Sequence, residues 1–151
     1  MEQKFDTKEG YILIVEDSPV DYEITTRALK RAGIDHPVHH CEDGNEALEF
    51  LTGENGQLEE KGYPSLILLD LNLPGTDGRD VLKEIKTTSD VKKVPVIILT
   101  TSNNENDIDI CYEAGANSYV KKPMAPDDYV EMAMTLKAFW FKWASLPGKG
   151  Y

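Results

Sequence analysis

The stretch PSLILLDLNLPGTDG, residues 64–78, places a carboxylate at the end of an apolar run. The apolar residues 66–69 are typical of a strand that is buried on both faces. Asp70 follows them directly, and the next residues, LNLPG at 71–75, indicate a loop because Pro and Gly favour turns. The sequence therefore predicts an acidic side chain at the end of a buried strand, followed directly by a loop.

Short apolar runs alternate with amphipathic segments along the rest of the chain. Strands are expected at 11–15, 37–41, 66–69, 94–99 and 117–120, and helices at 19–32, 44–52, 77–87, 105–114 and 126–145. Five β/α units in strict alternation predict an α/β protein, with a doubly wound parallel sheet of five strands and helices on both faces. No linker divides the chain, so we expect one domain over residues 1–151.

Composition and charge exclude several classes of protein. A net charge of −11 argues against a DNA-binding protein, which needs a basic surface, and favours basic partners or bound cations. No apolar stretch approaches the about 18 to 20 residues of a membrane span, and the polar N-terminus MEQKFDTKEG has no targeting core. Cys41 and Cys111 lie far apart without metal-ligand spacing, which indicates a reduced, cytoplasmic protein.

Acidic, hydroxyl and basic side chains follow the predicted strands at one edge of the sheet. Ligands bind at the carboxyl ends of the strands in an open parallel sheet, so these positions test for function. In the order of the strands along the chain, they hold Glu16-Asp17, Asp70, Thr100-Thr101 and Lys121-Lys122-Pro123.

This set of groups suits phosphoryl chemistry on a carboxylate. Three neighbouring acids repel one another unless their pKa values rise or a cation sits among them, and oxygen ligands of this kind suit Mg²⁺. Asp70 could then attack a phosphoryl donor and form an acyl phosphate. Thr100 and Lys122 would surround the charged phosphoryl oxygens.

The motifs VED at 15–17, LLDLNLPGTDG at 68–78, ILTTS at 98–102 and YVKKP at 119–123 resemble the receiver domain of two-component response regulators. The resemblance covers about residues 9–130 and implies the flavodoxin-like receiver fold, with strand order 2-1-3-4-5. It implies that Asp70 is the phosphoacceptor. It also implies that Mg²⁺ is held by Glu16, Asp17, Asp70 and the backbone carbonyl of Asn72.

The same resemblance implies roles for the residues after the last two strands. Thr100 is similar to the switch hydroxyl, Tyr119 to the aromatic residue that changes rotamer with it, and Lys122 to the phosphate-binding lysine. Pro123 would follow a cis peptide bond, which X-Pro pairs allow. Thr101 stands where a smaller residue is usual, which predicts a more closed pocket.

The resemblance also implies partners. The phosphoryl donor would be a sensor histidine kinase, and signalling would pass through the face formed by the helix at 105–114, the strand at 117–120 and the last helix, without an output domain. The long last helix and its LPG ending resemble single-domain regulators that partner phytochrome-type kinases. A degenerate receiver that acts only through protein contacts remains the alternative.

Four large aromatic residues in the segment LKAFWFKWASL wrap around more than one face of the last helix: Phe139, Trp140, Phe141 and Trp143. They could be covered by their own domain, contact a membrane surface with Lys137 and Lys142, or form a homodimer interface. We favour the homodimer, because aromatic residues commonly anchor interfaces.

Two other classes of protein, a phosphatase and a cofactor-binding protein, are disfavoured by individual residues of this chain. A phosphatase of the haloacid dehalogenase type needs a second Asp two residues after the nucleophile, where this chain has Asn72. A flavodoxin-like cofactor binder needs a first loop that accepts phosphate, and Glu16 and Asp17 would repel one. A metal site in HPVHHC, residues 36–41, is disfavoured because strand alternation sends His39 and His40 to opposite faces.

Overall fold

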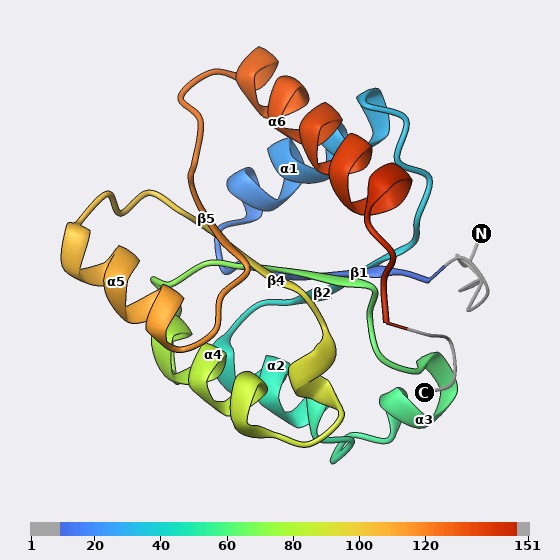
Figure 1. Cartoon of the computed structure of the whole chain (residues 1–151), viewed down its shortest axis with the longest axis vertical. Helices are drawn as coiled ribbons and strands as arrows, with labels where there is room; N and C mark the ends of the chain where they lie inside the picture. The colour runs from blue at the N-terminus through green and yellow to red at the C-terminus, as the bar shows by residue number, and fades with distance from the viewer. Residues whose placement is uncertain (1–9, 148–151) are drawn as a thin grey trace.

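The computed structural model describes residues 10–147, and a parallel sheet of five strands lies at its centre (Figure 1). The strand order is β2-β1-β3-β4-β5, and every neighbouring pair is parallel, which confirms the predicted fold. The strands are β1 (Ile12–Val15), β2 (Val38–Cys41), β3 (Leu66–Leu69), β4 (Val96–Thr100) and β5 (Ser118–Lys121).

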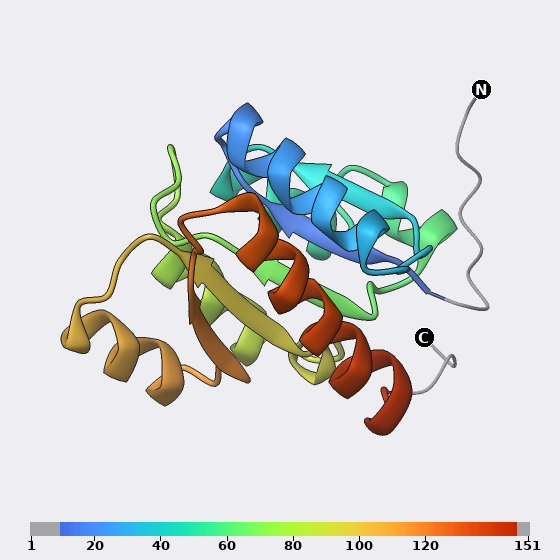
Figure 2. The ribbon, with the colours of Figure 1, turned by 90° about the horizontal axis from the view of Figure 1, so that it is seen from above.

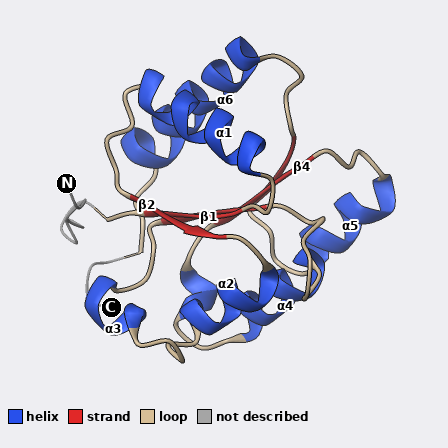
Figure 3. Ribbon diagram, turned by 180° about the vertical axis from the view of Figure 1, so that it is seen from behind, coloured by secondary structure: helices blue, strands red, loops and turns tan. Residues whose placement is uncertain are grey.

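Helices cover both faces of this sheet (Figures 2 and 3). α1 (Pro19–Arg31) and α6 (Pro126–Ala138) lie side by side on one face. The helices on the other side are α2 (Gly44–Leu51), α3 (Gln57–Lys61), α4 (Gly78–Thr87) and α5 (Glu105–Glu113). A 3-10 turn at Val91–Lys93 precedes β4, and a π-helical turn at Phe139–Trp143 extends α6. No helix within residues 10–147 is both long and apolar enough to cross a membrane.

The central strands are buried on both faces, because each face meets a layer of helices. Along β1 and β3, alternate residues enter different clusters. Leu13 and Leu69 pack with Phe50 of α2, whereas Ile14 and Leu68 pack on the side of α1 and α6. The continuous apolar run at 66–69 is therefore required by a strand with two buried faces.

The first turns of α1 and α4 lie near the edge of the sheet where Glu16, Asp17 and Asp70 are found, and side chains cap both helices. Ser18 caps α1 by accepting a hydrogen bond from the Asp21 N–H, and Asp77 caps α4 in the same way from Arg79. Gly78 begins α4 against the chain that follows β3, where an added Cβ would overlap the Asp70 carbonyl oxygen. The loop after Asp70 is thus held close to the start of α4.

The structure differs from the sequence prediction in one connecting segment and in the last helix. The long loop at 51–65 contains the short helix α3, which begins after Gly56 at φ 78° and ends at Gly62 at φ 70°. Glycine adopts these left-handed conformations readily, so the two residues delimit a helix that has no periodic apolar pattern. The last helix also departs from α geometry at Phe139, earlier than its predicted end.

Candidate functional site

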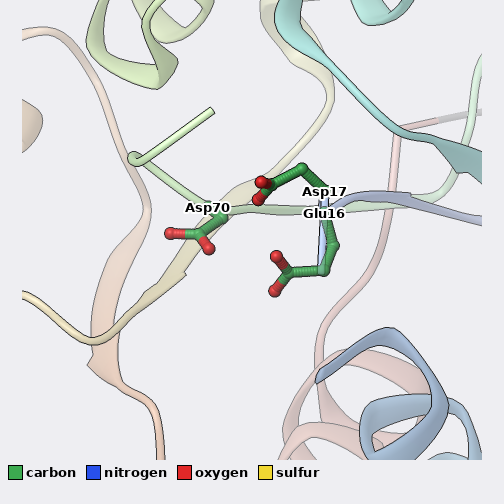
Figure 4. Close-up of side chains that lie close together, drawn as sticks. All are labelled: Glu16, Asp17 and Asp70. Atoms are coloured by element: carbon green, nitrogen blue, oxygen red, sulfur yellow. The ribbon is translucent and has the colours of Figure 1, made fainter. Parts of the chain in front are cut away.

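Three carboxylates meet where β1 and β3 end (Figure 4). One oxygen from each of Glu16, Asp17 and Asp70 lies within 4.8 Å of the others. Glu16 and Asp70 are buried, whereas Asp17 is exposed, so the cluster opens to solvent on one side. Three carboxylates with access to water fit a magnesium ion, which prefers oxygen ligands and keeps several waters. Among residues 10–147, this is the one group of three or more His, Cys, Asp or Glu side chains whose ligand atoms lie close enough together to hold a metal ion.

Lys122 neutralises part of this charge. Its Nζ lies 2.6 Å from Glu16 Oε1 and 2.8 Å from Asp70 Oδ2, and its side chain is only 5% exposed. A third carboxylate, Asp21 Oδ2 of α1, lies 2.7 Å from the same nitrogen. Burial alone would lower the pKa of Lys122, but the hydrogen bonds with Asp21, Asp70 and Glu16 outweigh it and raise the pKa. The lysine therefore stays charged at the centre of the site.

The pKa of Glu16 is raised by its place in the cluster. Burial raises the pKa of Glu16 to about 7, and the nearby charge of Asp70 adds to this rise, while Lys122 opposes it. The backbone N–H of Ser18 also donates to Glu16 Oε2, at 3.2 Å. A bound cation would favour the charged form of Glu16 and so reverse the direction of this shift.

Thr100 holds a buried hydroxyl that has no hydrogen-bond partner among the described residues. The residue is fully buried at the carboxyl end of β4, beside β3. An unsatisfied buried polar group is unfavourable by about 1–3 kcal/mol, and such groups often mark functional sites. Thr101, next to it, is exposed. The Thr100 hydroxyl therefore has unused hydrogen-bonding capacity at the end of the strand beside β3, which Asp70 follows.

Tyr119 is connected to the loop that follows Thr100. Its hydroxyl donates to the Ser102 carbonyl at 2.9 Å. The Ser102 hydroxyl donates to Asp107 Oδ2 at 2.7 Å, and Arg79 Nε donates to Asp107 Oδ1 at 2.8 Å. These bonds lower the pKa of Asp107, the bond from Arg79 most strongly. The network joins β5, α5 and the start of α4.

Two contacts in these networks were not predicted from the sequence: Asp21 with Lys122, and Arg79 with Asp107. Asp21 is remote from Lys122 in sequence, and the only signal for it is its place in the first turn of the helix that follows Glu16 and Asp17. Arg79 and Asp107 lie on different helices, so their ion pair depends on how α4 and α5 pack. Neither contact could be deduced from spacing along the chain.

The expected cis peptide bond before Pro123 is wrong, and the expected metal contact of the Asn72 carbonyl stays a prediction. Residues 10–147 contain no cis peptide bond, so the Lys122–Pro123 bond is trans. The trans form is the intrinsically favoured one for X-Pro bonds, by about 0.5–1 kcal/mol, and Lys122 reaches its three carboxylates with it. The Asn72 N–H donates to Asp70 Oδ1 at 3.3 Å, whereas a metal contact of its carbonyl stays a prediction.

The aromatic residues of the tail divide into two pairs. Trp140 and Phe141 are half-buried and pack on the core, and the Phe141 ring stacks on His36 at 4.2 Å. Phe139 and Trp143 are 54% and 75% exposed. A groove of about 450 Å³ runs between β5 and α6, and Phe139 and Trp140 form part of its lining. The tail thus covers its own domain with one pair and presents the other to solvent.

The histidines of β2 point to opposite faces, as strand alternation predicts. The His39 ring stacks on Phe50 of α2 at 4.1 Å, and its Nδ1 accepts a hydrogen bond from Lys61 at 2.7 Å. The His40 ring stacks on Tyr22 of α1 at 3.6 Å. The His40 Nε2 donates to the Glu16 carbonyl at 2.8 Å, which supports the end of β1.

Comparisons with known proteins agree with this geometry. Residues 12–134 match the family model of the response regulator receiver domain. The response regulator Rcp1 of Synechocystis sp. (strain ATCC 27184 / PCC 6803 / Kazusa) is 43% identical over 136 residues, which cover 90% of this chain and 92% of Rcp1.

Solved structures of two such regulators are similar over nearly their whole length. The Mn²⁺-bound form of Rcp1 gives a TM-score of 0.83 at 42% identity, covering 92% of this chain and 99% of that one. The phosphorylated cyanobacterial phytochrome response regulator RcpA gives 0.85 at 38% identity, with the same coverage of 92% and 99%. This chain therefore belongs to the response regulator receiver domains, the phosphoryl-accepting signalling domains of two-component systems.

Proposed function

We propose that Asp70 accepts a phosphoryl group from a sensor histidine kinase in a reaction that requires Mg²⁺. The observation that carries this proposal is the arrangement around Asp70. Two further acids lie beside it, Lys122 donates to it at 2.8 Å, and the buried Thr100 hydroxyl at the same edge has no partner among residues 10–147. A carboxylate with these neighbours is suited to become an acyl phosphate.

The transfer forms one bond and breaks another. A carboxylate oxygen of Asp70 attacks the phosphorus, and the bond from phosphorus to the donor's imidazole nitrogen breaks. The electron pair leaves with the imidazole, which takes a proton from water. Lys122 and Thr100 stabilise the charge on the phosphoryl oxygens. A magnesium ion held by Glu16, Asp17, Asp70 and the Asn72 carbonyl would offset the repulsion between the carboxylates and the incoming phosphate.

Phosphorylation would bias a two-state equilibrium in the face formed by α5, β5 and α6. The Thr100 hydroxyl would move towards a phosphoryl oxygen, and Tyr119 would follow. Because Tyr119 donates to the Ser102 carbonyl and Ser102 binds Asp107 of α5, a shift at Thr100 would change the contacts between β5 and α5. A ligand shifts such an equilibrium only through different contacts in the two states, and these residues supply them.

A second copy of this chain is the proposed occupant of the groove between β5 and α6. Phe139 lines this groove and is exposed, and Trp143, four residues further along the chain, is exposed as well. The first half of α6 holds Asp128 and Glu131 at the groove, whereas Lys142 follows the helix. A two-fold arrangement of two copies would therefore bring acidic and basic ends together.

The proposed kinase partner is a phytochrome-type sensor, and the exchange would occur in the cytoplasm. The similarity to RcpA, a phytochrome response regulator, supports the first point. Cys41 and Cys111 are buried and unpaired, which supports a reducing compartment.

Intact-mass measurement tests the proposed function. We expect one added phosphoryl group when the wild type is incubated with acetyl phosphate and Mg²⁺, and none for Asp70→Asn or after chelation of the metal. A stable complex with beryllofluoride would reveal an acceptor whose acyl phosphate decays before measurement. Failure of both experiments would contradict the proposal and favour a receiver that works by protein contact alone.

A further inference from the structure

Lys122 has a third carboxylate partner that belongs neither to the strand ends nor to the group of three acids. Asp21 lies in the first turn of α1, and its Oδ2 is 2.7 Å from Lys122 Nζ. α1 and α6 lie side by side on one face of the sheet (Figure 2). Lys122 directly follows β5, in the segment that leads into α6. The packing of α1 on this face therefore brings a fourth acid to the phosphoryl-accepting edge.

The three carboxylates use the whole donor capacity of Lys122. An ammonium group has three N–H donors, and Glu16, Asp21 and Asp70 lie at 2.6, 2.7 and 2.8 Å from it. A phosphoryl oxygen can therefore bond to Lys122 only when one of these contacts is released. The competition between the phosphoryl group and the three acids is a direct result of this geometry.

Asp21 is the acid that is released at the least cost in free energy. Its side chain is 30% exposed, compared with 5% for Glu16 and 7% for Asp70. A partly exposed carboxylate can be hydrated where it stands, whereas a buried one would lose its partner without gaining water. Asp70 itself would carry the phosphoryl group, and Glu16 is a buried member of the same group of three acids.

We infer that Asp21 is a positioning residue that restrains Lys122 in the unphosphorylated protein and competes with the phosphoryl group for it. This inference rests on the proposed function, because it assigns a regulator of the same reaction. Asp21 would lower the affinity of the site for a phosphoryl group and so raise the threshold for activation.

A purely structural role for Asp21 predicts a different result. An acid in the first turn of a helix stabilises the helix through its dipole, and its loss would weaken α1 and the whole site. In that case, removal of the Asp21 charge would lower the affinity for a phosphate mimic or leave it unchanged. The two roles therefore differ in the sign of the effect on binding.

The test is the dissociation constant for beryllofluoride at saturating Mg²⁺, measured by titration calorimetry for three proteins. Asp21→Asn removes the charge without changing the shape of the side chain. Glu23→Gln removes a charge from the same helix, where Glu23 is exposed and paired with Arg27 at 2.7 Å. We expect Asp21→Asn to bind about three- to tenfold more tightly than the wild type, and Glu23→Gln to stay within about twofold of it.

Repeating the beryllofluoride titrations in about 1 M salt distinguishes direct competition for Lys122 from a general effect of the Asp21 charge on the binding of an anion. Screening shortens electrostatic range to about 3 Å under these conditions, so the tighter binding of Asp21→Asn persists only if Asp21 acts through its contact with Lys122. Equal or weaker binding by Asp21→Asn, or a gain that vanishes in salt, would overturn the inference while the proposed function stands. Absence of binding by the wild type would also overturn this inference, and together with the absence of a phosphoryl adduct from acetyl phosphate it would contradict the proposed function as well.

Discussion

The hydroxyl of Tyr119 donates a 2.9 Å hydrogen bond to the carbonyl of Ser102, which ties β5 to the loop after Thr100. The bond is half-buried, and burial is the main cause of the raised pKa of Tyr119. Tyr119 is thus already connected to the segment that Thr100 would move. A movement of Thr100 would therefore reach Tyr119 through this bond.

Tyr119→Phe tests this connection. Loss of one hydrogen bond of this kind is expected to lower the free energy of unfolding by about 0.5–1.5 kcal/mol, which urea denaturation would measure. Hydrogen exchange should also become faster at the backbone amides of residues 102–104. Unchanged exchange in that loop would show that the Tyr119 hydroxyl does not restrain it.

Thr100→Val should make the folded protein more stable while it weakens the binding of a phosphate mimic. The substitution replaces a hydroxyl without a partner among the described residues by a methyl group of similar size, so we expect stability to rise by about 1 kcal/mol. The affinity for beryllofluoride should fall by about tenfold or more, because a donor to the phosphoryl oxygens is lost. Thermal denaturation and calorimetry measure the two effects.

Thr25→Val is the matched control for that variant. Thr25 is also buried, but its hydroxyl donates to the Asp21 carbonyl at 2.8 Å. Valine at this position should therefore lower stability by about 1 kcal/mol, the opposite sign to Thr100→Val. The same sign for both variants would mean that the Thr100 hydroxyl has a partner in solution.

His39 makes the stability depend on pH. Burial, followed by the charges of Lys61 and His40, lowers the pKa of His39 to about 4, from 6.5 in its ordinary state. Between these values the unfolded chain binds more protons than the folded one, so stability is fully present above pH 6.5 and decreases as the pH falls towards 4. Protonation would also remove the acceptor that Lys61 uses.

His39→Gln should flatten this dependence. Urea denaturation at a series of pH values between 4 and 7 would compare the slopes of the wild type and the variant. A variant that loses stability over this interval as steeply as the wild type would assign the effect to other groups.

The exposed aromatic pair should control association and not folding. Trp143 is 75% exposed, so Trp143→Ala is expected to weaken a dimer in analytical ultracentrifugation while the melting temperature stays within about 1–2 °C. Phe141→Ala should lower the melting temperature, because Phe141 packs on the core. If the dimer is coupled to phosphorylation, beryllofluoride should strengthen it. Equal dimer affinity with and without the mimic would contradict that coupling.

The sequence predicted the central strand and the site edge well for a physical reason. Residues 66–69 must be apolar on both faces, and parallel strands bring their carboxyl ends together, so Asp70, Glu16 and Lys122 could be placed on one edge without coordinates. The contact between Asp21 and Lys122 could not, because it depends on the packing of α1 against the sheet. Helix α3 was missed because glycine conformations delimit it and no apolar period marks it.

Reduction of the acyl phosphate by borohydride tests the central claim most directly. Protein treated with acetyl phosphate and Mg²⁺ is reduced, digested and sequenced by mass spectrometry, since an aspartyl phosphate is converted to homoserine. We predict homoserine at position 70 in the wild type and at no position when the metal is chelated. Homoserine at position 17, or a phosphoryl adduct that leaves position 70 as aspartate, would contradict the account.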